Sequence, residues 1–198
     1  MRLSRGEYQS HPWRIREIAP DFRLEDAWAL PATGAAEDFA TLLEVMGALD
    51  PGKGKSLPTR VLFGIRNCLG AVLGWDDPGE RLPIPGEAET SLRERLPEDL
   101  RGTADGLGLG SSSFRPLYRT NDEWAAELSN RTVHGVVHLV WVDTADGRYQ
   151  GRLGVYVKPR GTLGILYMAA IAPFRHHIVY PALMRQVGEA WNARPARR

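Results

Sequence analysis

The sequence contains very little cysteine and no excess of charge. Cys68 is the only cysteine among 198 residues, which excludes an intrachain disulfide framework and a zinc site built from several cysteines. Lys and Arg total 25 against 24 Asp and Glu, so the chain offers no extended positive field to nucleic acid. We therefore expect a protein of a reducing compartment, with no nucleic-acid partner.

Long apolar runs are also missing. No stretch approaches the roughly 18 apolar residues of a membrane-spanning helix, and residues 1–10 lack the apolar core of a secretory signal. These absences predict a cytoplasmic protein without a membrane span. Residues 1–11 and 194–198 are expected to be frayed, because chain ends with few apolar residues are rarely held down.

Two glycine clusters imitate nucleotide-binding motifs without completing them. Gly54-Lys55-Ser56 resembles the end of a phosphate-binding loop, but Leu49 occupies the position of its first glycine. Gly106, Gly108 and Gly110 lack the helix start that a dinucleotide fingerprint requires. We therefore expect the protein to bind no nucleotide and no other cofactor.

What is present is the composition of an ordinary globular chain, with 43% hydrophobic and 25% charged residues. Its length suits one domain spanning residues 1–198. Residues 39–49 carry apolar side chains at helical spacing, and 58–73 repeat this pattern after a first-turn proline. Two N-terminal helices are therefore predicted, preceded by a strand over 13–22.

The second half changes to strand-length runs separated by turn residues. The predicted strands are 114–119, 123–129, 133–142, 149–158 and 163–170. Hairpin turns are predicted at 143–147 and 158–161. A long C-terminal helix should begin at Pro173 and kink or restart at Pro181, which cannot donate a backbone hydrogen bond. The order of elements predicts an α+β fold with an antiparallel sheet.

The strand over 133–142 carries the most informative polar residues. Alternation places His134 and His138 on one face among valines, and buried imidazoles need hydrogen-bond partners. Glu127 and Asn130 lie just upstream and are the expected partners. Structural hydrogen bonding is favoured; general-base catalysis by a histidine with Glu127, and metal binding, remain alternatives. We expect no metal, because the pair lacks a definite third ligand.

Several phrases of the second half together resemble one family. They are 121–127 (NDEWAAE), 130–135 (NRTVHG), 156–159 (YVKP), 167–171 (YMAAI), 173–176 (PFRH) and 179–181 (VYP). The resemblance is to the bacterial domain-of-unknown-function family number twenty-eight sixty-seven, and it covers roughly residues 112–192. That family is similar to the START and polyketide-cyclase (SRPBCC) superfamily. The resemblance implies a helix-grip fold, in which a curved antiparallel sheet wraps around a long C-terminal helix and leaves a cavity.

The resemblance gives no established catalytic residue, so the site is predicted from the cavity it implies. Its expected lining residues are His134, His138, Glu127, Asn130, Tyr156, Tyr167, Phe174 and Ile178. The favoured function is binding of a small hydrophobic or amphipathic molecule between the sheet and the last helix. The alternative is a cyclase, hydrolase or isomerase that uses His134 or His138 with Glu127 as a general base. On the C-terminal helix, Phe174, Ile178, Leu183 and Val187 are expected to face the sheet.

Overall fold

The computed structural model describes residues 1–49, 91–104, 114–129, 132–144 and 146–194. The N-terminal elements are α1 (Arg5–Gln9), α2 (Ile15–Ile18), β1 (Arg23–Gly34), η1 (Ala36–Asp38) and α3 (Phe39–Ala48). After residue 90 follow η3 (Leu92–Arg95), η4 (Glu98–Leu100), β2 (Arg115–Arg119), β3 (Glu123–Ser129), β4 (Val133–Asp143) and β5 (Tyr149–Pro159). The C-terminal elements are α5 (Gly161–Phe174), the π-helical turn η5 (Arg175–Val179) and α6 (Tyr180–Ala193).

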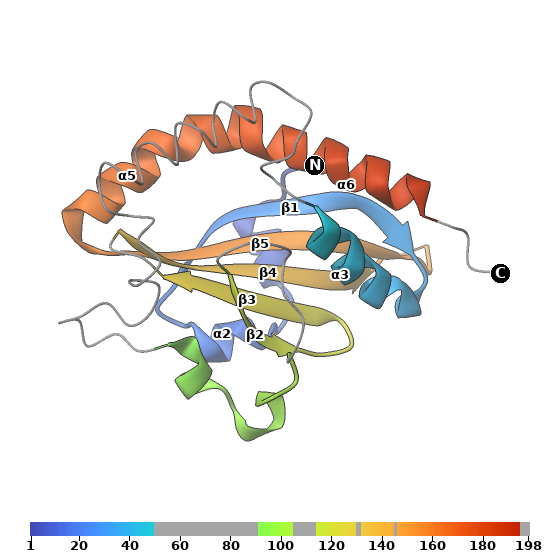
Figure 1. The fold of residues 1–198 in the computed structure, drawn as a ribbon, viewed down its shortest axis with the longest axis horizontal. Coiled ribbons are helices and arrows are strands. Elements are labelled where there is room, and N and C mark those ends of the chain that lie inside the picture. Colours follow the sequence, from blue (N-terminus) through green and yellow to red (C-terminus); the bar gives the residue numbers. More distant parts are fainter. Residues whose placement is uncertain (50–90, 105–113, 130–131, 145, 195–198) are drawn as a thin grey trace.

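The five strands form one antiparallel sheet in the order β1-β5-β4-β3-β2, and the predicted α+β class is confirmed. The first strand thus pairs with the last one, and the meander β2 to β5 completes the sheet. Figure 1 shows the long C-terminal helix crossing one face of the sheet, with α2 on the opposite side. No helix in the described parts of the chain has both the length and the hydropathy needed to cross a bilayer.

Each face of the sheet has its own apolar core. The face under α3 and α6, here called the helix face, buries Trp124, Leu139 and Trp141 together with Val187 and Trp191 of α6. The other face, here called the N-terminal face, packs against α1, α2, η3 and η4. Its core contains Tyr8, Trp13, Ile15, Ile18, Leu92, Leu100, Val136, Val140 and Tyr156. Strand β4 is therefore central, with buried side chains on both sides.

Most of the predicted strands are confirmed, but the N-terminal prediction is wrong. Residues 13–22 contain the helical turn α2, in which Ile15 and Ile18 are buried three residues apart on one side. The real first strand, β1, does not alternate cleanly, because its register against β5 shifts twice. Residues 1–9, which the sequence predicts to be frayed, pack on the protein: Tyr8 is buried, and the Leu3 amide bonds to Ala27.

The apolar run at 163–170 is helix α5 rather than a strand, and 158–161 is no hairpin turn. Gly161 has a φ of 59°, which lets the chain leave β5 and turn directly into the helix. Gly164 and Met168, four residues apart, form the buried side of α5. The predicted hairpin at 143–147 does join β4 to β5, and the predicted helix at 39–49 is α3.

The C-terminal helix is interrupted next to Pro181, as predicted. Pro181 has no N–H to offer the carbonyl of His177, so an α-helical ladder cannot run through this point. The chain makes a π turn instead, in which the Tyr180 amide bonds to the Arg175 carbonyl, and α6 starts afresh. The predicted helix at 58–73, the glycine clusters, Cys68 and Asn130 lie outside the described residues.

Three leucines test this packing. Leu139 is fully buried, Leu183 is half-buried, and Leu166 on α5 is 67% exposed. We expect Leu139→Ala to lower the free energy of unfolding by about 2–5 kcal/mol, Leu183→Ala by less, and Leu166→Ala by close to nothing. Urea unfolding followed by circular dichroism measures the series. An equal loss at Leu166 would mean that α5 is covered in solution.

Candidate functional site

Two glutamate–histidine pairs lie between β3 and β4 on the N-terminal face. His134 Nε2 is 2.9 Å from Glu127 Oε2, and His138 Nε2 is 3.0 Å from Glu123 Oε2. In the β3–β4 register each glutamate lies two residues along from the position opposite its histidine. The same four-residue spacing on both strands therefore produces two equivalent diagonal pairs.

Further donors complete the first pair. The Ser91 hydroxyl and the Leu92 amide both donate to Glu127, whose side chain is fully buried. Burial raises the pKa of Glu127, but hydrogen bonds from His134, Ser91 and Leu92 lower it by more than burial raises it. The pKa of Glu127 therefore lies below its ordinary value. The pair thus ties η3 to the sheet.

The second pair holds the N-terminal segment. Tyr118 donates its hydroxyl to Glu123, and the Arg14 amide donates to the same carboxylate. On the other side of His138, the Tyr8 hydroxyl lies 3.0 Å from Nδ1. The Tyr8 hydroxyl also donates to the backbone carbonyl of His138 at 3.3 Å, so α1 is held to both the ring and the backbone of this residue. Burial raises the pKa of Tyr8 well above its ordinary value, so the phenol remains a donor.

These pairs are sealed rather than open. The His134 and His138 side chains are 1% and 0% exposed, and α1, α2 and η3 cover them. Tyr156 lies on the same N-terminal face. The expectation that these residues look toward the C-terminal helix is therefore wrong. Alternation along the strand predicts which residues share a face, but it does not say which face the helix covers.

The other predicted lining residues are on the C-terminal helix. Tyr167 is half-buried against Val133, Val157 and Met168. Ile178 is half-buried, whereas Phe174 is 49% exposed and does not face the sheet as predicted. Val187 is fully buried against the helix face, and Leu183 packs beside it, as expected.

A second polar cluster, missed in the sequence, lies on the helix face. Asp26 of β1 is 2% exposed; its Oδ1 is 2.6 Å from His176 Nε2, and its Oδ2 accepts a hydrogen bond from Tyr180 at 2.9 Å. Arg175 reaches both Glu25 and Asp26, at 3.4 and 3.6 Å, and Arg2 approaches Asp26 at 3.8 Å. Unlike His138, His176 is reachable, with 24% of its side chain exposed.

Two irregularities build this cluster. A register shift between Leu24 and Asp26 inserts Glu25 as an extra residue, so Leu24 and Asp26 point to opposite faces instead of the same one. The π turn η5 brings His176 and Tyr180 over Asp26. Pro173 and Pro181, which flank His176, are the sequence signal for an irregular turn in the helix. The bulge in β1 has no comparable signal in the sequence.

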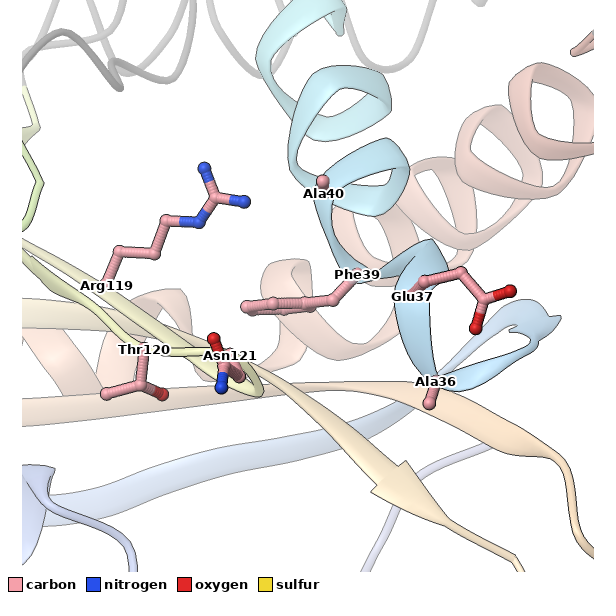
Figure 2. Close-up of a pocket in the computed structure, with 7 residues that line it drawn as sticks. All are labelled: Ala36, Glu37, Phe39, Ala40, Arg119, Thr120 and Asn121. Atoms are coloured by element: carbon pink, nitrogen blue, oxygen red, sulfur yellow. The ribbon is translucent and has the colours of Figure 1, made fainter.

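A hollow of about 600 Å³ lies elsewhere, between the start of α3 and the turn from β2 to β3 (Figure 2). It is lined by Ala36, Glu37, Phe39, Ala40, Arg119, Thr120 and Asn121. Phe39 is its only buried lining residue, and no buried charged side chain enters it. Within the described ranges, no three His, Cys, Asp or Glu side chains are grouped as a metal site requires.

The depressed pKa of Glu127 predicts a pH-dependent stability. A carboxylate with a lowered folded pKa stabilises the protein fully above its unfolded value, about 4.5, and loses that contribution as the pH falls through the folded value. We expect the free energy of unfolding to fall less steeply below about pH 4.5 in Glu127→Gln than in the wild type. Glu94→Gln, at an exposed position of η3, should retain the wild-type slope in urea unfolding.

Gly154 supplies a second test of the sealed network. A Cβ at this position would lie 2.6 Å from the Tyr8 ring and hydroxyl, so Gly154→Ala should displace Tyr8 and cost about 1–3 kcal/mol. On a Tyr8→Ala background the same change should cost almost nothing, which a double-mutant cycle measures. Gly6→Ala, where no atom lies within 4 Å, is the control. Additive losses would show that Tyr8 does not occupy this position.

Comparison with known proteins gives one family. The family model described as protein of unknown function (DUF2867) matches residues 18–182, which covers most of the chain and all five strands of the sheet. No curated protein and no solved structure matches the chain significantly. The chain therefore belongs to the DUF2867 family of proteins of unknown function.

Proposed function

We propose that the protein binds a small hydrophobic or amphipathic molecule in a space between the helix face of the sheet and the C-terminal helix. The observation that carries this proposal is an open stretch of the central strands. Val137 of β4 and Val155 of β5 are paired neighbours on the helix face, yet both are only half-buried. Central strands are normally covered, so partly uncovered valines there suit an apolar ligand.

Gly135 supports the same space. Among the described residues, a Cβ built on it would meet only backbone oxygens of the two neighbouring strands, at 3.8 and 3.9 Å. The other two glycines of the central pair differ: at Gly151 the Cβ would touch Leu42 and Leu30, and at Gly154 it would strike Tyr8. Gly135 thus has room above it that side chains fill at the other two positions.

Two buried donors on the helix face have no hydrogen-bond partner. The indole Nε1 atoms of Trp28 and Trp124 are both buried and unpaired. The two tryptophans lie at the ends of one row of paired residues that crosses four strands. The row runs through Trp28, Leu153, Leu139 and Trp124. Buried donors are rarely left unpaired, and a ligand acceptor would satisfy them.

The helix-grip architecture of the START and polyketide-cyclase superfamily is part of this proposal. Its support is the pairing of the first strand with the last and the long helix that crosses the sheet. The polar end of the space differs from the sequence prediction, because the cluster on the helix face is Asp26, His176 and Tyr180. The enzymatic alternative based on His134 or His138 loses its support, since both rings are sealed.

Filling the space tests binding. We expect Gly135→Leu to reduce the affinity for Nile red, an apolar fluorescent probe, by at least about tenfold, while leaving the fold intact because a strand tolerates leucine better than glycine. The measurement is a fluorescence titration, supported by native mass spectrometry for retained molecules.

Gly6→Leu is the matched control, since it adds the same side chain at a glycine without neighbours on α1. It should bind the probe as the wild type does. Equal affinity in wild type and Gly135→Leu would remove the proposed space from consideration.

A further inference from the structure

We propose that His176, Asp26 and Tyr180 form an acid–base site that takes a proton from a weakly acidic hydroxyl group, such as a phenol or an enol, on a small apolar molecule. This inference rests on the proposed function, because it assigns the polar end of the same space. Asp26, Val155 and Val137 are consecutive neighbours across β1, β5 and β4 on the helix face. The cluster therefore adjoins the open valines directly.

Asp26 fixes the orientation of the imidazole. Its Oδ1 is 2.6 Å from His176 Nε2, so the proton of the neutral ring is held on Nε2, and Nδ1 keeps its lone pair. An imidazole oriented by a buried carboxylate is the arrangement of a general base. The ring is 24% exposed, whereas Asp26 behind it is buried, so a ligand can reach the base but not its partner.

Tyr180 supports the carboxylate. Burial raises the pKa of this phenol, and the neighbouring Asp26 raises it further, so Tyr180 keeps its proton and donates it to Asp26 Oδ2. The stacked rings of Tyr180 and His176 lie 6.2 Å apart between centroids. Tyr180 is thus a positioning residue: it holds Asp26, and Asp26 holds the base.

The proton step balances within the described groups. The O–H bond of the ligand breaks, its electron pair stays on oxygen, and His176 Nδ1 gains the proton. The resulting imidazolium is paired with Asp26, while Arg175 and Arg2 offset the charges of Asp26 and Glu25. Trp28, whose ring packs 4.9 Å from Tyr180, has the unpaired indole N–H that the new oxyanion requires.

The local backbone agrees with a functional role. A π turn is rare, and both π turns and β-bulges recur at functional sites. Here they meet at one buried carboxylate, since the bulge at Glu25 turns Asp26 to the helix face and the π turn supplies His176.

The probe for this site is meta-nitrophenol, whose ionised form absorbs visible light. Binding to the full chain is followed by tryptophan fluorescence. Ionisation is followed by absorbance at about pH 7, above the ordinary histidine value, where the free probe is still mostly neutral. We expect the bound probe to show an ionised fraction at least about tenfold above that of the free probe. His176→Gln, which can still donate to Asp26, should bind the probe but lose this excess.

His177→Gln is the matched control, because it changes the adjacent, exposed histidine of the same π turn. It should retain the full excess. Tyr180→Phe should shift the pH profile of the excess without abolishing it, which a purely structural role would not do. Excess ionisation that survives in His176→Gln, or that is lost equally in His177→Gln, would overturn the acid–base site.

Nile red separates the two proposals. Binding of Nile red without binding of meta-nitrophenol would overturn the acid–base site and leave the proposed function standing. Ionisation of the phenol in a protein that fails to bind Nile red would overturn the proposed function and leave the acid–base site standing. Failure of both probes to bind would remove both proposals.

Discussion

Buried carboxylates are the constraint on which this structure depends, because an unpaired buried charge would destabilise it by several kcal/mol. Glu123 and Glu127 lie on the N-terminal face, and each receives donors from a β4 histidine and from a segment distant in sequence. The amide of Arg14 and the amide of Leu92 are therefore fixed by the sheet. The N-terminal segment and η3 are held by polar contacts as well as by apolar burial.

Asp26 solves the same problem on the opposite face with different partners. Its donors come from the C-terminal helix, so this one residue links the edge strand β1 to η5 and α6. The two kinds of pair differ in access to solvent. His138 has both ring nitrogens engaged and no exposed surface, whereas His176 is bonded through Nε2 and remains partly exposed. Solvent access therefore distinguishes His176 from His138.

The sequence predicted the parts of the fold whose local pattern matches their surroundings. Strands β2 to β5 have strand length and turn residues between them, and α3 has clean helical spacing. The sequence predicts a strand where helix α5 lies, because this run is apolar throughout and lacks the periodicity that distinguishes a helix from a strand. Strand β1 was missed because its register shifts break the alternation that identifies a strand.

The candidate site was harder to predict, and His134 and His176 show why. The pairing of His134 with Glu127 follows from strand register, which local sequence encodes well. The sequence therefore predicts the partner of His134, but it does not predict that the pair lies on the face opposite the C-terminal helix. His176 meets Asp26 across 150 residues, through a bulge and a π turn that no simple periodicity contains. The two histidines thus differ in the backbone that places them. Regular strand pairing places His134 in a buried contact, whereas a bulge and a π turn place His176 in a partly exposed one. The accessible histidine is the one that a bound molecule can meet.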